Sequence, residues 1–413
     1  MSTDRRVVVT GMGAISPLGN DVASTWEAMK AGVCGIGMIT KFDTEPHKVK
    51  IAAEVRNFDA LQYMDKIELS HSDLYTQFAV AAAAQAMEDS GIKGTVAPER
   101  IGAYIGTGIG GIGTFMEQHS MLLNRGPRRV SPFFIPMMIA NMAAGQIAIR
   151  YGCKGPAMPA VTACASGSNA IGEALRCIRH GYADAMIAGG AEATVNEIAL
   201  AGFANMKALS TSEDPMTASL PFDVRRKGFV MGEGAGVLIL EEYEHAVARG
   251  AKIYAELCGY GSTCDAFHMT QPDPEAEGGA RAIADAWKEA GMQTERIYIN
   301  AHGTGTPMND KVETLAIKKA LGEDLARKVV ISSTKSMTGH MLGAAGGMEA
   351  IVSVLALREG IVPPTIGLTD PDPECDLDYV PLKARKMELD AAISTSLGFG
   401  GHNACLAFRK VQS

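Results

Sequence analysis

The stretch Val161-Thr-Ala-Cys-Ala-Ser-Gly-Ser168 places one cysteine among small residues, between an apolar segment and a segment with helical periodicity. Upstream, Pro159-Ala-Val161 is typical of the end of a buried strand. Downstream, apolar residues recur at helical spacing, at Ile171, Leu175 and Ile178, so we expect a helix that begins at about Cys164. A thiol at a helix N-terminus faces unpaired N–H groups and the positive end of the dipole, which favour the nucleophilic thiolate. The alternative is an inert core cysteine, and the rest of the chain decides between the two.

Composition points to a layered α/β protein. The chain has 413 residues, of which 47% are hydrophobic, only 6% are aromatic and 46 are glycine. This length predicts two domains or one fused double domain. The formal net charge of −8, with no basic block, argues against nucleic acid as a partner.

The ends and the cysteines predict a cytoplasmic protein with free thiols. The first residues carry no signal-peptide core, and no apolar run reaches membrane-spanning length without charges. We therefore expect no membrane contact. Eight cysteines are scattered without any Cys-x-x-Cys pair, so neither a zinc site nor a disulfide framework is indicated, and we expect no metal.

Strands alternate with helices along the chain, which predicts largely parallel sheets covered on both faces. The expected strands are Val7–Thr10, Ile101–Ile105, Ala185–Ala188, Val237–Glu241, Ile253–Leu257, Ile297–Asn300, Val329–Ser332 and Cys405–Phe408. The expected helices are Tyr75–Asp89, Ile171–His180, Ala280–Ala290, Val312–Leu321 and Met348–Arg358. Gly-rich turns follow strands in both parts, which suggests two tightly packed halves, 1–250 and 251–413, although no clear repeat of individual residues is visible.

Two histidines follow strands in the second half. His302 opens His302-Gly-Thr-Gly-Thr-Pro307, and Lys335-Ser-Met-Thr-Gly-His340 follows the next strand. Because sites in α/β sheets gather beyond the carboxyl ends of strands, we expect both imidazoles to meet there. A cysteine with two histidines suits thioester chemistry, in which the thiolate takes an acyl group and the imidazoles donate hydrogen bonds to an enolate-like oxygen.

Three glycine-rich segments need separate interpretations. In Ser396-Leu-Gly-Phe-Gly-Gly-His-Asn403, glycines around Phe399 suggest a backbone N–H donor with a movable side chain, and an ordinary hairpin is the alternative. We interpret His402 as structural. The segments after Thr10 and Gly106 resemble dinucleotide-binding turns, but neither has the expected acidic strand end or crossover, so tight turns and close packing are favoured.

Together these segments resemble the 3-oxoacyl-[acyl-carrier-protein] synthases, the condensing enzymes of type II fatty acid synthesis. The matching motifs run almost end to end: Arg6-Val-Val-Val-Thr-Gly11, Gly106-Thr-Gly-Ile-Gly-Gly111, Gly126-Pro-Arg-Arg-Val-Ser-Pro-Phe-Phe134, Thr162-Ala-Cys-Ala-Ser-Gly167, Gly228-Phe-Val-Met-Gly-Glu-Gly-Ala235, His302-Gly-Thr-Gly-Thr-Pro307, Lys335-Ser-Met-Thr-Gly-His340 and Gly398-Phe-Gly-Gly-His-Asn403. The resemblance implies a thiolase-like α/β fold, with two similar halves forming a five-layered α-β-α-β-α core, usually in a homodimer.

The resemblance also implies residue roles. Cys164 would accept the acyl group, and His302 and His340 would bind the malonyl carbonyl and promote decarboxylation, supported electrostatically by Lys335. The N–H groups of Cys164 and Phe399 would form the oxyanion hole, and the Phe399 ring would gate the acyl pocket. Thr304 and Thr306 would contact the pantetheine arm or malonyl group, while the acyl tunnel would be lined by Ile109 and Phe203.

The implied reaction is a decarboxylative Claisen condensation of the acyl group on Cys164 with malonyl-carrier protein, without metal or redox cofactor. Phosphopantetheine would arrive on an acidic acyl carrier protein, which requires a local basic patch. The matching family positions are Arg125, Arg128, Arg129 and Lys207. Two departures stand out: the segment 65–73 has one lysine where relatives are often basic, and Lys227 replaces a common acid.

Two alternatives remain open at this point. A polyketide ketosynthase would share the cysteine and both histidines. A non-catalytic partner of the chain-length-factor kind would lack the nucleophile, so the presence of Cys164 argues against it. A thiolase would use a second cysteine in a Cys-x-Gly turn, whereas Cys405 falls within a predicted strand.

Overall fold

The computed structural model of the chain describes residues 5–411 and contains one large sheet of two matching sets of strands. The N-terminal set follows the order β1 (Val7–Ile15), β7 (Gly234–Glu242), β6 (Ala185–Glu192), β4 (Ile101–Gly106) and β5 (Ala157–Ala160). The C-terminal set follows the order β8 (Ala255–Cys264), β14 (His402–Arg409), β13 (Ala391–Gly398), β9 (Ile297–Asn300) and β10 (Val330–Ser332). The two sets meet where Val7–Val9 of β1 pair with Ala255–Leu257 of β8.

Strand directions repeat between the sets. In each set the first three strands are antiparallel neighbours, and the last three are parallel neighbours. The predicted division into two similar halves is therefore visible in the topology. The boundary expected at 250/251 falls between the end of α9 (Tyr243–Ala248) and the start of β8.

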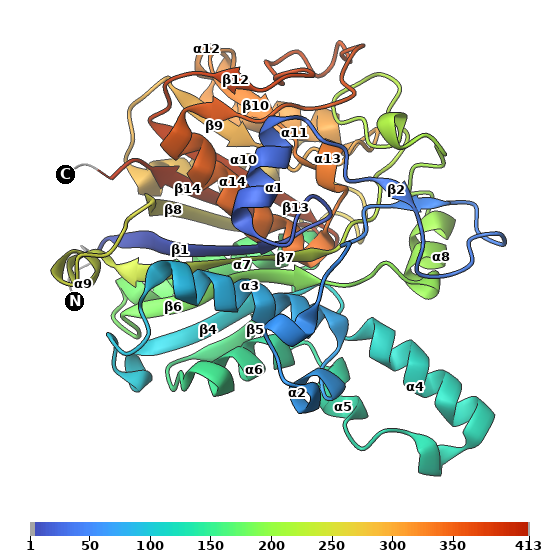
Figure 1. Cartoon of the computed structure of the whole chain (residues 1–413). Helices are drawn as coiled ribbons and strands as arrows, with labels where there is room; N and C mark the ends of the chain where they lie inside the picture. Colours follow the sequence, from blue (N-terminus) through green and yellow to red (C-terminus); the bar gives the residue numbers. More distant parts are fainter. Residues whose placement is uncertain (1–4, 412–413) are drawn as a thin grey trace.

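Helices form three layers around these strands (Figure 1). One outer layer, α3 (Leu74–Ser90) and α6 (Met142–Tyr151), covers the N-terminal set. The other outer layer contains α10 (Glu277–Ala290), which packs on β8 and β14, and α11 (Asn309–Leu321), which packs on α10. Between the sets lie α7 (Ser166–Arg179) and α14 (Ala345–Glu359), and α14 contacts β7 and β6 as well as β13 and β9. The predicted five-layered α-β-α-β-α core is confirmed.

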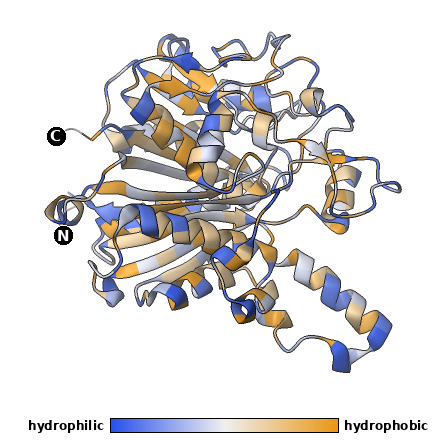
Figure 2. Ribbon diagram, in the orientation of Figure 1, coloured by the Kyte–Doolittle hydropathy of each residue, from blue (hydrophilic) through white to orange (hydrophobic). Residues whose placement is uncertain are grey.

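The remaining elements lie outside these layers. The other helices are α1 (Val22–Lys30), α2 (Lys66–Ser70), α4 (Ile112–Arg125), α5 (Phe134–Met138), α8 (Glu197–Asn205), α9, α12 (Glu323–Ala326) and α13 (Lys335–Thr338). The small strands are β2 (Gly37–Met38), β3 (Ile51–Ala52), β11 (Ile361–Val362) and β12 (Arg385–Lys386). Figure 1 shows α4 and α5 extending from the body as an arm, and hydrophilic residues lie mainly on such outer segments in Figure 2.

In each half the first strand packs against a helix through the same two residue types, a glycine on the strand and an alanine on the helix. The sequence pattern did not reveal this repeat. A Cβ atom on Gly13 of β1 would lie 1.9 Å from the carbonyl oxygen of Ala82 in α3. The equivalent atom on Gly261 of β8 would lie 1.8 Å from the carbonyl oxygen of Ala282 in α10. Glycine on the strand and alanine on the helix thus allow strand and helix backbones to touch in both halves.

All eight predicted strands and all five predicted helices overlap observed ones, but two local expectations near Cys164 are wrong. The strand β5 ends at Ala160 and is largely exposed, because it forms the edge of the sheet. The helix α7 begins at Ser166, after a 3₁₀ turn over Ala163–Ala165 (η4) that contains Cys164. The turn starts with Ala163 at φ +50°, a left-handed conformation that cannot belong to the helix.

Among residues 5–411, no helix combines the length and apolar character needed to cross a membrane. The absence of a signal-peptide core was expected partly from residues 1–4, which lie outside the described residues.

We predict that Gly261→Ala lowers the free energy of unfolding by about 1–3 kcal/mol or more, because the added methyl group overlaps backbone that cannot yield. Gly202→Ala is the matched control, since a Cβ atom there meets no atom within 4 Å and the residue lies in helix α8. Urea unfolding of both variants measures the difference. Equal stability of the two variants would contradict the close strand–helix contact.

Candidate active site

Three predicted residues from different parts of the chain meet in one place. Cys164 comes from the turn after β5, His302 from the loop after β9, and His340 from the loop after α13. The cysteine sulfur and one ring nitrogen of each histidine all lie within 4.8 Å of one another, and all three side chains are buried. The imidazole rings are nearly perpendicular, with centroids 5.2 Å apart. The N-terminal half supplies the cysteine and the C-terminal half supplies both histidines.

Backbone N–H groups point at the sulfur from two segments. Burial raises the thiol pKa, and the N–H groups of Cys164 and Phe399, which both interact with the thiol, oppose that rise in part. The Phe399 segment can come this close because residue 398 is glycine: a Cβ atom there would lie 2.8 Å from the Thr162 carbonyl oxygen and 3.3 Å from the Cys164 nitrogen. The arrangement is the pair of donors expected of an oxyanion hole.

The expected preference for a thiolate is not found. Burial raises the pKa of the Cys164 thiol to about 12, and the carboxylate of Glu192 raises it further, against the lowering effect of the Lys335 charge. The cysteine lies in the 3₁₀ turn rather than in α7, and its side chain is almost completely removed from water. The Cys164 side chain is therefore a neutral thiol at neutral pH.

Both histidines are neutral for the same reason. Burial lowers the pKa of His302 and of His340 well below the usual range, and the Lys335 charge lowers both further. The Leu342 N–H donates to His340 Nδ1 at 3.2 Å, so the ring proton lies on Nε2. Among residues 5–411, His340 Nε2 and His302 Nδ1 are buried without hydrogen-bond partners. Nε2 of His340 is thus a donor, while His302 remains able to accept a proton.

Lys335 lies at the start of α13 and forms a buried ion pair with Glu349 of α14. Burial raises the pKa of Cys164 and lowers those of His302 and His340, and the Lys335 charge opposes the rise at the thiol and adds to the lowering at both imidazoles. The sequence analysis missed Glu349, although a lone acid in the apolar segment after Gly346-Gly347 is a signal, because buried carboxylates require partners.

A second missed acid, Glu313 of α11, orients the first histidine. Its carboxylate accepts the backbone N–H groups of His302 and Gly303, each at 2.7 Å, and the Thr395 hydroxyl at 2.6 Å. Burial raises the pKa of Glu313 to about 7, against the effect of these donors. This carboxylate fixes the loop that carries the His302 ring.

Glu192, at the end of β6, joins the two halves beside the cysteine. It accepts the Gly108 N–H at 2.6 Å and the Gly343 N–H at 2.9 Å, together with the Thr107 hydroxyl at 3.0 Å. The Gly106–Gly111 segment is therefore a tight turn clamped by a carboxylate, as the packing interpretation predicts. It does not bring Ile109 to the cavity wall, and that side chain is 42% exposed.

A cavity of about 300 Å³ leads to the three central residues. The predicted residues that line it are Cys164, His302, His340, Phe399, Phe203, Thr304, Thr306 and Lys207. Aromatic rings form part of the wall: Phe203 lies 6.3 Å from Phe399, and Phe229, which the sequence analysis did not single out, lies 5.2 Å from His340 between ring centroids. The thiol therefore lies in a largely apolar chamber.

The predicted basic residues occupy two separate regions of the chain. Lys207 is exposed after α8, on the lining of the cavity. Arg125, Arg128 and Arg129 are exposed at the tip of the α4 arm (Figure 1). In the segment 65–73, Asp65 and Asp73 cap the starts of α2 and α3, which gives these acids a structural role. Nothing in the structure explains Lys227.

Comparisons with known proteins agree with this geometry. Residues 4–246 match the family "Beta-ketoacyl synthase, N-terminal domain", and residues 254–369 match "Beta-ketoacyl synthase, C-terminal domain". The chain is 54% identical over 411 residues to 3-oxoacyl-[acyl-carrier-protein] synthase 2 of Synechocystis sp., covering 99% of each chain. It is 52% identical over 415 residues to the protein of the same name from Staphylococcus aureus, covering 100% of each.

A solved structure is also similar over nearly the whole chain. A ketosynthase bound to a hexaketide, in complex with its type II PKS acyl-carrier protein, superposes with a TM-score of 0.90 at 35% identity. The match covers 99% of this chain and 100% of the other.

Proposed function

The chain belongs to the beta-ketoacyl synthase family, and we propose that it catalyses fatty acid elongation by condensing an acyl group held on Cys164 with malonyl-carrier protein. The products are 3-oxoacyl-carrier protein, carbon dioxide and free carrier protein. One observation carries the proposal: a buried thiol, two backbone N–H donors and an unpartnered imidazole N–H share one cavity.

The first half-reaction transfers the acyl group to the enzyme. The Cys164 sulfur attacks the thioester carbonyl. The N–H groups of Cys164 and Phe399 donate hydrogen bonds to the carbonyl oxygen and stabilise the negative charge that develops on it. The thiol proton moves to the departing carrier thiolate. The carbon–sulfur bond to the carrier breaks, and an acyl thioester remains on Cys164.

The second half-reaction forms the carbon–carbon bond. The malonyl thioester carbonyl accepts hydrogen bonds from His340 Nε2 and from the neutral His302 ring, and these bonds stabilise the enolate formed when the bond to the carboxylate breaks and carbon dioxide leaves. The carbanion carbon attacks the acyl carbonyl, again held by the two backbone N–H groups. The Cys164 thiolate is expelled and takes up a proton.

No cofactor of the enzyme's own is needed for this chemistry, because decarboxylation itself supplies the carbanion. Phosphopantetheine is part of the carrier protein that brings each substrate. Cys164, His302 and His340 are spaced closely enough to hold a metal ion, so acylation and condensation are measured with a chelator present. Condensation that survives chelation supports the proposal, and loss of activity that zinc restores would contradict it.

The partner is an acyl carrier protein carrying the acyl or malonyl group. The similar ketosynthase solved with its acyl-carrier protein supports this partner. Exposed cations complement an acidic carrier: Lys207 beside the cavity, with Arg125, Arg128 and Arg129 on the α4 arm. Thr304 and Thr306 on the cavity lining are placed to contact the pantetheine arm, and Phe203 to contact the acyl chain.

The alternatives are less well supported. The full-length relatives that are more than half identical are named 3-oxoacyl-[acyl-carrier-protein] synthase 2, whereas the ketosynthase of the polyketide complex is 35% identical. A non-catalytic partner would not need the complete set of cysteine, histidines and oxyanion donors found in the cavity.

The sheet edge favours a homodimer. The strand β5 leaves one edge of the sheet unpaired in the described chain, and its side chains at Ala157–Pro159 are exposed. Nearby apolar side chains are also exposed, among them Val161 and Ile149. An unpaired apolar edge fits a second copy of the same chain, whose edge strand would continue the sheet.

The eight free cysteines also favour a location in the cytoplasm.

We predict that Cys164→Ala folds but forms no acyl adduct and no 3-oxoacyl product, because no other group lies where the thiol does. Intact-mass spectrometry after incubation with acyl-carrier protein, in the presence of a chelator, measures the adduct. The control is Cys34→Ala, a partly buried cysteine outside the cavity, which should acylate normally. An acyl adduct that persists on the Cys164 variant would remove the nucleophile assignment.

For His340→Ala and His302→Ala, we expect near-normal acylation but slower release of carbon dioxide from malonyl-carrier protein. Loss of one oxyanion donor costs about 10²–10³ in rate. The distant, exposed His180 at the end of α7 provides a control variant, His180→Ala. Normal carbon dioxide release by both cavity variants would refute their role.

Sedimentation velocity should find a species of twice the 43.5 kDa chain mass. The variant Met158→Glu, which places a charge on the exposed edge strand, should shift it towards the monomer. A wild-type protein that remains monomeric would contradict the homodimer.

A further inference from the structure

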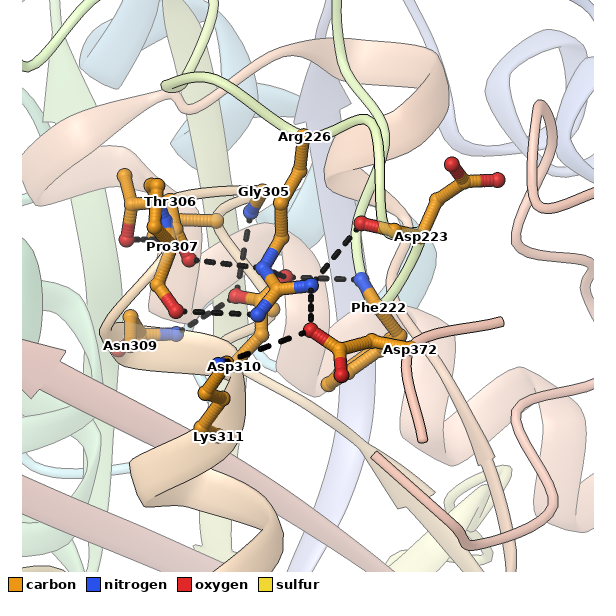
Figure 3. Close-up of polar contacts among 12 residues, drawn as sticks. Phe222, Asp223, Arg226, Gly305, Thr306, Pro307, Asn309, Asp310, Lys311 and Asp372 are labelled. Carbon is orange, nitrogen blue, oxygen red and sulfur yellow. Dashed lines mark hydrogen bonds and ion pairs between the residues drawn. The ribbon is translucent and has the colours of Figure 1, made fainter. Parts of the chain in front are cut away.

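A buried arginine binds the backbone of a segment that lines the active-site cavity, and Figure 3 shows its polar contacts. The side chain of Arg226 is only 2% exposed. Its Nε donates to the Thr306 carbonyl oxygen at 3.1 Å, and one terminal nitrogen donates to the Pro307 carbonyl oxygen at 3.0 Å. The guanidinium therefore binds the backbone of the segment whose Thr304 and Thr306 side chains line the cavity.

Two carboxylates hold this guanidinium in place. The other terminal nitrogen of Arg226 donates to Asp372 at 2.7 Å and to the Asp223 carbonyl oxygen at 2.9 Å. Asp310 lies 3.6 Å from Arg226 Nε, and it accepts the N–H groups of Gly305 and Phe222 at 3.2 and 2.8 Å. Arg226 thus binds the carbonyl groups of Thr306 and Pro307, and Asp310 binds the N–H group of Gly305 in the same loop.

The loop that they grip has no regular structure of its own. Residues 301–306 belong to no helix or strand, and Gly303 and Gly305 have φ values of +37° and +75°. Gly228 adds one bond, from its N–H to the Gly305 carbonyl oxygen at 3.0 Å. The hydroxyl groups of Thr304 and Thr306 lie 3.0 Å apart and bind each other. Because both side chains belong to this loop, the loop backbone sets the positions of both hydroxyl groups. A shift of the guanidinium would move both hydroxyl groups.

We propose that Arg226 is a positioning residue that sets this threonine wall for the pantetheine arm of the carrier-bound substrates. The inference rests on the proposed function. The planar guanidinium of arginine reaches three carbonyl oxygens and a carboxylate at once, which the single ammonium group of lysine cannot do in the same geometry. Both half-reactions use carrier-bound thioesters, so both depend on this wall.

The purely structural alternative gives a different result. A buried arginine with paired acids can simply stabilise the fold, and its loss then affects every substrate in proportion to the protein that remains folded. A positioning residue instead affects substrates according to whether they have the arm. Thioesters of N-acetylcysteamine keep the reacting group but lack most of the arm, so they distinguish the two roles.

The test compares Arg226→Lys with wild type on malonyl-carrier protein and on malonyl-N-acetylcysteamine. We expect KM for the carrier substrate to rise about tenfold with kcat changed by less than about twofold, and the short thioester to change by less than about twofold. The matched control is Arg225→Lys. This neighbouring side chain is 45% exposed and binds Asp223 and Thr369 away from the cavity, so both substrates should behave as in wild type.

Asp372→Asn is the second variant, since it loosens the guanidinium from a less buried partner and leaves Arg226 in place. Asp372→Asn should also raise KM for malonyl-carrier protein relative to KM for malonyl-N-acetylcysteamine, but by a smaller factor than Arg226→Lys. This comparison can be made even if Arg226→Lys does not fold. Alkylation of Cys164 by iodoacetamide, which has no arm, should be unchanged in folded variants. Equal losses of activity on the carrier-bound and the short thioester would overturn the proposal. An Asp372→Asn variant whose two KM values keep their wild-type ratio would overturn it as well. Wild-type protein inactive on both thioesters would instead refute the proposed function.

Discussion

Backbone contact between the two halves is the constraint on which the site depends. A Cβ atom on Gly190 of β6 would lie 2.3 Å from the Gly343 carbonyl oxygen, and one on Gly347 of α14 would lie 2.2 Å from the Gly236 carbonyl oxygen. Only glycine allows the turn before α14 to press against the N-terminal strands in this way. His340 lies just before that turn, so the contact carries it towards Cys164. The carboxylate of Glu192 then ties the same turn to the Gly106–Gly111 segment.

Burial at this junction determines the chemistry. Water is largely excluded from the thiol and from both imidazoles, so all three rest in their neutral forms. Charge develops only during reaction, on oxygen atoms that meet N–H donors already in position, where a low local dielectric strengthens each hydrogen bond. At this depth Glu349 pairs with Lys335 and offsets the cost of removing both groups from water. Neutral donors near a paired charge suit a reaction in which negative charge moves between thioester oxygens.

Sequence patterns predicted the alternation of strands and helices and the central residues, because both depend on local signals, whereas the five layers were expected from the family resemblance. The expectation of largely parallel sheets is wrong, because the first three strands of each set are antiparallel. Alternating strands and helices gave the α/β architecture, and histidines after strands were expected at the same edge of the sheet. Glu313 and Arg226 were missed because they bind backbone groups, and no side-chain motif marks such bonds, whether the partner is 11 residues away, as for Glu313 and His302, or 80 residues away, as for Arg226 and Thr306. The neutral state of Cys164 was missed for a related reason: burial is a property of the assembled halves, whereas the helix-dipole argument considered one turn alone. The paired Gly-x-Gly strands, Gly11–Gly13 and Gly259–Gly261, became recognisable as a repeat only beside their helices.

A crystal structure of the acylated enzyme tests the central claim most directly. The account predicts one acyl chain, in thioester linkage to the Cys164 sulfur, with its carbonyl oxygen within hydrogen-bond distance of the N–H groups of Cys164 and Phe399. His302 and His340 should face the open side of the same carbonyl group. An acyl chain on another residue, or a carbonyl oxygen directed away from both N–H groups, would contradict the account.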